Sequence, residues 1–166
     1  QSFPLYSLQG GSPHFFGLPA YFNNTLYVQG VGEYLKAYAF TNGQLNPAAI
    51  SQSLDVLGFR GATPSISSQG NSNGIVWQIA LTMNGNASLR AYNATNLPQK
   101  LYDTYLNTVA GLPDQFNYHK FIVPTIANGK VYAGTGNSLN VFGLRCFFRT
   151  VRRNNATGAI DMTFTG

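Results

Sequence analysis

Few side chains in this sequence could carry acid, base or metal chemistry, and they are widely scattered. The acidic residues, histidines and cysteine are Glu33, Asp55, Asp103, Asp114, Asp161, His14, His119 and Cys146. No two carboxylates lie close enough in the sequence to mark a paired acid and base, and each histidine stands alone before a predicted strand. A single cysteine excludes a disulfide within this sequence and a CxxC metal site.

Nucleophilic and phosphate-binding motifs are not indicated either. Ser67 and Ser68 have no histidine or aspartate near them in the sequence. The segment GTGNS at 134–138 is neither a nucleophile elbow nor a phosphate loop, because no helix is predicted after it. Glu33 is expected at an exposed turn. We therefore predict no catalytic residue and no metal ligand, and the sequence identifies no cofactor-binding residue.

The composition indicates one domain of an exported β protein. Hydrophobic residues make up 44% of the 166 residues and charged residues only 9%, against about 25% charged in an average globular protein. The longest nearly apolar run, Phe15 to Phe22, is far shorter than the roughly 20 residues that span a bilayer, so no membrane span is predicted. We expect the protein to be secreted or to reside in the periplasm or cell envelope.

The positive charge is concentrated at the C-terminal end. The formal net charge is +5, and four of the ten basic residues fall in the last 22 positions, namely Arg145, Arg149, Arg152 and Arg153. The rest of the chain has no basic stripe that could follow a phosphate backbone, so no nucleic-acid partner is predicted. We interpret residues 145–166 as an atypical basic tail; the alternative is that IDMTFT, at 160–165, adds a strand to a sheet edge.

A threefold internal repeat is the strongest signal. The segment YFNNTLYVQGVGEYLKAY at 21–38 returns as IANGKVYAGTGNSLNVF at 126–142, and a third copy lies between them, with closing strand SLRAYNA at 88–94. Tyr27 aligns with Tyr132, and a proline opens each copy at 19, 64 and 124. Alternating apolar and polar residues in each closing segment predict β-strands. Units of this length indicate propeller blades.

Turn chemistry supports four antiparallel strands in each unit. Asn128-Gly129 and Asn23-Asn24 lie between apolar runs and suit a type I′ hairpin turn. The polar segments GQLNPAAISQ and QKLYDTY are expected to form the outer strands. One local alternative is a short helix through Leu97, Leu101 and Tyr105, which are spaced by four. A lectin-type β-sandwich is the other alternative, but it predicts no repeat.

The units NGKVYAGTGNSLNVF and NNTLYVQGVGEYLKAY resemble the repeats of pyrroloquinoline-quinone (PQQ) type β-propellers over residues 13–144. The resemblance implies an all-β fold with three or so four-stranded antiparallel blades, at about 13–60, 61–110 and 115–144, in a partial ring. The tryptophan that docks many such blades onto their neighbours is missing, and Trp77 falls in a middle strand instead. We expect Tyr38, Tyr92 and Phe142 to dock the blades.

The resemblance implies a blade more strongly than an activity. The expected function is a non-catalytic binding or scaffold segment of an exported propeller, with no cofactor. One alternative is part of a quinoprotein dehydrogenase, with PQQ and calcium bound by blades outside this chain. The second alternative is a carbohydrate-binding propeller. Three units are fewer than the four to eight of closed propellers, so a C-terminal fragment is expected, with remaining blades or a second copy as partners.

Four glycosylation sequons occur, beginning at Asn23, Asn86, Asn93 and Asn155. Asn23 and Asn86 are expected at turn tips. Because sequons arise by chance in an Asn-rich chain, we expect no glycans.

Overall fold

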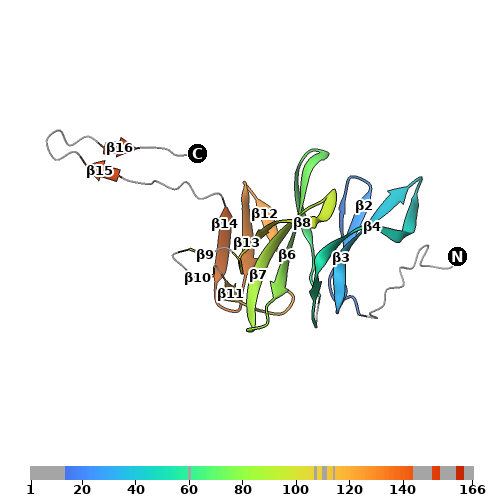
Figure 1. The fold of residues 1–166 in the computed structure, drawn as a ribbon, viewed down its shortest axis with the longest axis horizontal. Helices are drawn as coiled ribbons and strands as arrows, with labels where there is room; N and C mark the ends of the chain where they lie inside the picture. Colours follow the sequence, from blue (N-terminus) through green and yellow to red (C-terminus); the bar gives the residue numbers. More distant parts are fainter. Residues whose placement is uncertain are drawn as a thin grey trace.

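The protein consists of antiparallel β-sheets that follow one another along the chain (Figure 1). The computed structural model describes residues 14–59, 61–106, 108–109, 112–113, 115–143, 151–153 and 160–162. Within these ranges every regular element is a strand and none is a helix. One sheet is strongly curled, like a half-barrel. The predicted all-β class with antiparallel sheets is thus confirmed, and the first sheet has the predicted four strands.

The first sheet is a four-stranded meander. Its strands are β1 (Ala20–Phe22), β2 (Thr25–Val28), β3 (Glu33–Thr41) and β4 (Gln44–Leu57), and each pairs with the next. Asn23 and Asn24 join β1 to β2 with φ of 45° and 57°. Positive φ at both central residues is what a type I′ turn requires, so this predicted turn is confirmed.

The second sheet repeats this order and gains a fifth strand. Its strands are β5 (Ser65–Gln69), β6 (Ser72–Leu81), β7 (Asn86–Asn93) and β8 (Asn96–Asp103), and the short β11 (Phe116–Asn117) pairs with the beginning of β7. The helix considered for Leu97, Leu101 and Tyr105 is wrong, because β8 pairs with β7, opposite Ala91 and Tyr92. Burial of Leu97 beneath the first sheet favours the extended chain over the local helical spacing.

The third sheet has three described strands, β12 (Thr125–Ala127), β13 (Lys130–Gly134) and β14 (Leu139–Gly143). The predicted Asn128-Gly129 turn joins the first two, with φ of 51° and 68°. Two hairpins stand apart from the three sheets: β9 (Thr108–Val109) with β10 (Leu112–Pro113), and β15 (Val151–Arg153) with β16 (Ile160–Met162). Among the described residues, Ile160–Met162 therefore pairs with Val151–Arg153 and not with an edge of a larger sheet.

The three sheets share one pairing register. Tyr27 of β2, Trp77 of β6 and Tyr132 of β13 lie opposite Ala37, Ala91 and Val141 of the following strands. Tyr38, Tyr92 and Phe142 come next in those strands, where they face Leu26, Val76 and Val131. The repeat found in the sequence therefore places equivalent residues at equivalent points of each sheet.

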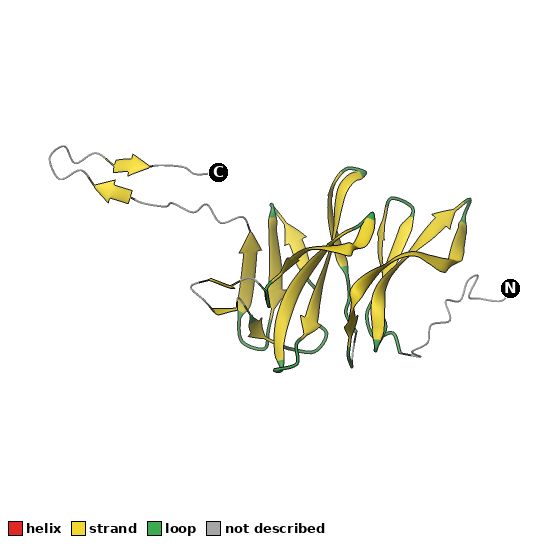
Figure 2. Cartoon of the chain, viewed as in Figure 1, coloured by secondary structure: helices red, strands yellow, loops and turns green. Residues whose placement is uncertain are grey.

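The three sheets lie next to one another in chain order (Figure 2). They pack together through two apolar clusters. Between the first and second sheets, Tyr27 and Leu35 pack on Val76 and Tyr92. Between the second and third sheets, Ile79 and Leu89 pack with Val131 and Phe142. The Tyr27 face of each sheet thus meets the Tyr92 face of the next. Trp77 packs in the second cluster, so docking involves Tyr27 and Trp77 in addition to the expected Tyr92 and Phe142. Tyr38, also expected to dock, is buried but belongs to neither of these two clusters.

Candidate functional site

A large groove opens between the second and third sheets. Its volume is about 720 Å³, within the range of about 300–1,000 Å³ usual for small-molecule sites. Four aromatic side chains and several amides and hydroxyls contribute to its walls. The residues that line it are Ser67, Ile75, Trp77, Tyr102, Gln115, Phe116, Ile126, Gly129, Lys130, Val131, Asn140, Val141, Phe142 and Gly143.

One repeat position explains why the groove is open. In the first sheet Phe22 fills this position and packs on Gly74 of the second sheet, so closely that a Cβ on Gly74 would lie 2.4 Å from the phenyl ring. By register, Ser67 of the second sheet is the equivalent of Phe22, and Gly129 of the third sheet is the equivalent of Gly74. A serine replaces the phenyl ring and the opposing glycine is retained. The space that Phe22 fills at one interface is therefore empty at the next.

The aromatic side chains of the groove are fixed by their neighbours. The Trp77 indole Nε1 donates a hydrogen bond of 2.9 Å to Ser67 Oγ. The Trp77 ring is 6.5 Å from Tyr102, centroid to centroid, and Phe116 is 5.5 Å from Phe142. Such separations are typical of interacting aromatic pairs. The rings thus form a preformed apolar surface with little rotamer freedom to lose on binding a ligand.

The groove also has a polar donor without a partner. Gln115 Oε1 accepts hydrogen bonds of 3.2 Å from Asn84 Nδ2 and from Asn86 Nδ2, which fixes the orientation of the amide. Its Nε2 is buried and donates to nothing in the described part of the chain. A buried donor without an acceptor costs roughly 1–3 kcal/mol. An acceptor on a bound molecule would remove that cost.

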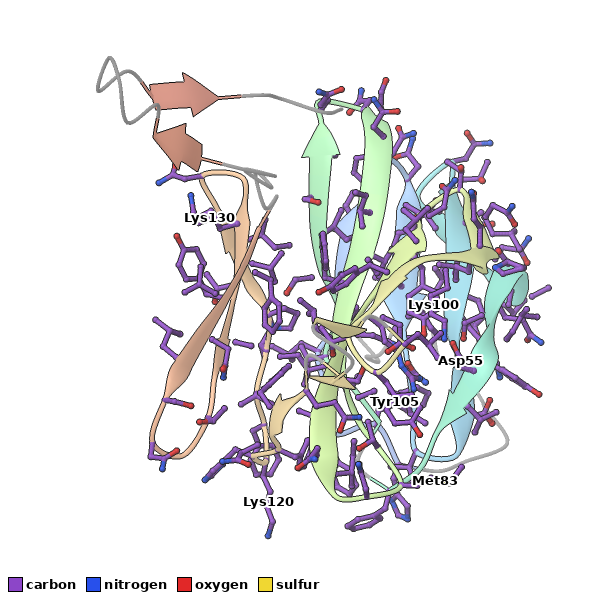
Figure 3. All side chains as sticks on the ribbon, turned by 60° about the vertical axis from the view of Figure 1, so that its left-hand side comes forward. Asp55, Met83, Lys100, Tyr105, Lys120 and Lys130 are labelled. Atoms are coloured by element: carbon purple, nitrogen blue, oxygen red, sulfur yellow. The ribbon has the colours of Figure 1, made fainter. Side chains whose placement is uncertain are left out.

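A separate cluster of charges lies on β4, β7 and β8, and Figure 3 labels two of its members, Asp55 and Lys100. Lys100 Nζ lies 3.0 Å from Asp55 Oδ2 and 2.9 Å from Asp103 Oδ2. Asp103 is almost fully buried and also accepts hydrogen bonds from Ser88 Oγ at 2.5 Å and from the Tyr105 backbone N–H at 3.0 Å. Arg90 Nε lies 3.2 Å from Asp103 Oδ2, as an ion pair without hydrogen-bond alignment.

The environment of Asp103 favours its charged form. Burial by itself raises the pKa of the carboxyl group, but the hydrogen bonds from Ser88 and Lys100, the charge of Arg90 and the Tyr105 N–H together hold the pKa below its ordinary value. A carboxylate that is kept ionised and fully bonded has no spare proton to transfer. Asp103 therefore serves to hold β7 and β8 together.

Tyr92 connects this cluster to the first sheet. Its hydroxyl donates to Asp55 Oδ2 at 3.0 Å and accepts from Gln78 Nε2 at 3.3 Å. Burial raises the pKa of Tyr92 above its ordinary value, an effect strengthened by Asp55 and opposed by Arg90. The phenol thus stays protonated at neutral pH. The cluster is a polar link between the first and second sheets, and sequence analysis missed it because Asp55 and Asp103 are far apart in the chain.

The remaining residues considered from the sequence are dispersed. Glu33 begins β3 and pairs with Lys36, so it is not at an exposed turn. His14 stacks on Phe16 with centroids 5.8 Å apart, and His119 is exposed, with Nδ1 near the Lys120 carbonyl. Ser68 donates to the Gly70 carbonyl. The side chains of Asp114, Asp161 and Cys146 lie outside the described residues. Of the acidic residues, histidines and serines considered from the sequence, Ser67 is the one described residue that lines the groove, and Trp77, Gly129 and Phe142 line it too.

The sequons differ in their surroundings. Asn23 is exposed at the β1–β2 turn, as expected. The expectation for Asn86 is wrong, because it is the partly buried first residue of β7 and its amide donates to Gln115. Asn93 ends β7 and bonds to Gln99 and Thr95. Asn155 lies outside the described residues.

Comparison of the chain with protein-family models, with curated proteins and with solved structures finds no significant match. Among the described residues, no group of three or more His, Cys, Asp or Glu side chains is placed to hold a metal ion. No helix in the described ranges is long and apolar enough to cross a membrane.

Proposed function

We propose that this protein is a non-catalytic binding and scaffold module of an exported propeller-type protein, and that its ligand occupies the groove between the second and third sheets. The observation that carries the proposal is the open position at Ser67 and Gly129, which the equivalent interface fills with Phe22. The stacked sheets supply a rigid scaffold. The low charged fraction of 9% supports export to the cell envelope or the medium.

The groove suits a ligand with an apolar face and a few polar groups. Trp77, Tyr102, Phe116 and Phe142 offer ring faces and edges for contact. Gln115 Nε2 offers a donor, and Lys130 adds a positive charge among the lining residues. Concave sites of this type take their affinity from apolar contact and their orientation from sparse polar groups.

Carbohydrate is the second candidate ligand class, favoured by the joint presence of Trp77 and Tyr102 with Asn140 and Gln115. Aromatic rings pack against the apolar faces of sugar rings, while amides bond to hydroxyl groups. No specific observation among the described residues favours the dehydrogenase alternative; dye reduction after addition of PQQ and calcium would reveal such an activity.

Trp77 is the one tryptophan of the sequence and lines the groove, so its fluorescence reports binding there. We would titrate the full chain with a panel of neutral and acidic oligosaccharides and with a library of small aromatic compounds, and follow Trp77 fluorescence. Binding at the groove should change the intensity or wavelength saturably. A saturable response to a sugar would establish a carbohydrate ligand. A saturable response to an aromatic compound would establish the more general binding module.

Two phenylalanine variants locate the binding. Ser67→Phe should fill the groove as Phe22 fills the preceding interface, and binding should fall at least tenfold. Ser68→Phe is the matched control, because Ser68 is exposed next to the groove and does not line it. A fluorescence response that persists unchanged in Ser67→Phe, or the lack of any response across both panels, would refute the proposed site.

A further inference from the structure

The outer face of the third sheet carries apolar side chains that the corresponding faces of the other sheets bury. By register, Tyr132, Val141 and Leu139 are equivalent to Tyr27, Ala37 and Leu35 of the first sheet. In the first sheet these positions are buried against the second sheet. In the third sheet Leu139 is 64% and Val141 52% exposed. The third sheet thus presents a docking face that no described segment covers.

The outward side of the first sheet is the opposite kind of face. Tyr38 is already buried there, only 8% exposed, and the exposed apolar side chains are Tyr21, Leu54 and Val56. Leu26 and Tyr38 are the register equivalents of Val76 and Tyr92, which receive the Tyr27 face of the preceding sheet. No sheet precedes the first one in the described chain. On the same face Tyr21 is 59% exposed. Tyr21 pairs with Leu26, so their side chains lie on one side of the sheet.

The long strand β4 extends this face. Ser53 bonds to the Leu35 N–H, and Asp55 reaches Tyr92 of the second sheet. Side chains alternate along a strand, so Leu54 and Val56 point away from the second sheet. Leu54 is 77% exposed, and Val56 pairs with Tyr34 on the outer side. Apolar area left in water forgoes about 25 cal/mol per Å² of stabilisation.

We propose that two copies of this chain associate head to tail, with the third sheet of each copy docked on the first sheet of the other. The two faces are the two halves of an interface that the chain already makes internally, so the contact continues an existing mode of packing. A head-to-tail contact closes into a ring of two copies when it relates them by a half-turn, and this closure is part of the proposal. The pair is then a ring of six stacked sheets, within the usual range of about four to eight blades.

A second copy is a better occupant than an unrelated protein for a specific reason. The faces are equivalent by register to surfaces that bind each other twice in this chain, through Tyr27 and Trp77 on one side and Tyr92 and Phe142 on the other. A partner of different structure would have to match both faces separately. A second copy matches both at once.

Sedimentation velocity or light scattering with size-exclusion chromatography tests the proposal on the full chain. The expected mass is twice that of the 18.0 kDa chain, and it should fall toward one chain on dilution. Leu139→Glu, on the third sheet, and Leu54→Glu, on the first, should each yield monomers. Met83→Glu is the control, because Met83 is fully exposed in the turn between β6 and β7, away from both faces.

Mixing the two variants distinguishes docking of the third sheet on the first from docking of two first sheets or two third sheets on each other. The intact first sheet of Leu139→Glu meets the intact third sheet of Leu54→Glu, so the mixture should recover a weaker heterodimer. If either variant alone still dimerises like the unmodified chain, the head-to-tail arrangement is refuted. An unmodified chain that is monomeric at all concentrations, or that forms open-ended oligomers, also refutes it, and neither result affects Trp77 titration of the groove.

Discussion

Asp103→Asn is the substitution with the clearest expected cost to stability. The carboxylate is 4% exposed and takes part in four interactions, with Ser88, the Tyr105 N–H, Lys100 and Arg90. An amide has almost the same shape but no charge, and its NH₂ group would face donors if it replaced Oδ1 or Oδ2. Lys100 keeps Asp55 as a partner, whereas Arg90, with only 14% of its side chain exposed, loses its described ion-pair partner.

The expected decrease in the free energy of unfolding follows from the lost Arg90–Asp103 ion pair. Removing one partner of a buried ion pair costs about 3–5 kcal/mol, and the retained contact of Lys100 with Asp55 places the expected loss near the lower end. With a urea m-value of about 2 kcal/mol/M, a loss of about 3 kcal/mol lowers the unfolding midpoint by roughly 1.5 M. Asp55→Asn is the matched control, because Asp55 is 29% exposed at its side chain and should cost about 1 kcal/mol or less.

The pH dependence gives a second readout of the same interaction. The folded-state pKa of Asp103 lies below its ordinary value, so the unfolded chain takes up the proton first as the pH falls. The stability due to Asp103 is therefore fully present above about pH 5 and is lost as the pH falls through the unfolded value near 3.9 toward the folded pKa. Urea midpoints between pH 7 and pH 3 should fall less steeply in Asp103→Asn. A loss below 1 kcal/mol at pH 7, or an unchanged pH slope, would refute the assigned role.

Three further substitutions test the packing between and within sheets. Tyr92→Phe removes the donor to Asp55 and the acceptor of Gln78, and urea unfolding should show a loss of about 1–3 kcal/mol. Gly74→Ala places a methyl group against the Phe22 ring and the Ala94 Cβ, so a loss of about 1–3 kcal/mol is expected in the same assay; an unchanged midpoint would contradict the close packing. Gly129→Ala meets no atom within 4 Å, but residue 129 has a φ of +68°, so backbone strain alone should cost about 1–2 kcal/mol in the same assay, and Gly129→Asn should recover part of that loss.

The sequence predicted the sheets well because local rules determine them. Alternation around Tyr38, Tyr92 and Phe142 indicated strands with two different faces, and the asparagine and glycine pairs indicated the turns. The outer strands were predicted from their place in the repeat, and β8 forms despite the helical spacing of Leu97 and Leu101. The fifth strand β11 was not predicted, since two residues that pair with β7 from a long connection have no local signature.

The candidate groove was harder to predict because it forms where a small side chain replaces a large one between two sheets. Trp77 was located in a middle strand, but its position between two sheets follows only from their stacking. Ser67 was rejected as a nucleophile from the sequence, and its hydrogen bond from the Trp77 indole was not foreseen. Alignment of the repeats by register would have shown Ser67 at the position of Phe22. That comparison needs the strand pairing of β1 with β2 and of β5 with β6.

The second sheet has Ser67 at the repeat position where the first sheet has Phe22, and this difference lowers the stability of the interface between the second and third sheets. Full burial of a phenylalanine side chain contributes about 1.5–3 kcal/mol, and the second interface forgoes that contribution while keeping the glycine that would accommodate the ring. Gln115 Nε2 adds the cost of a buried donor without a partner at the same place. Two unfavourable terms in one location are difficult to explain by folding alone. They are expected where a surface is retained for binding, because a ligand that fills the space and accepts the hydrogen bond recovers both.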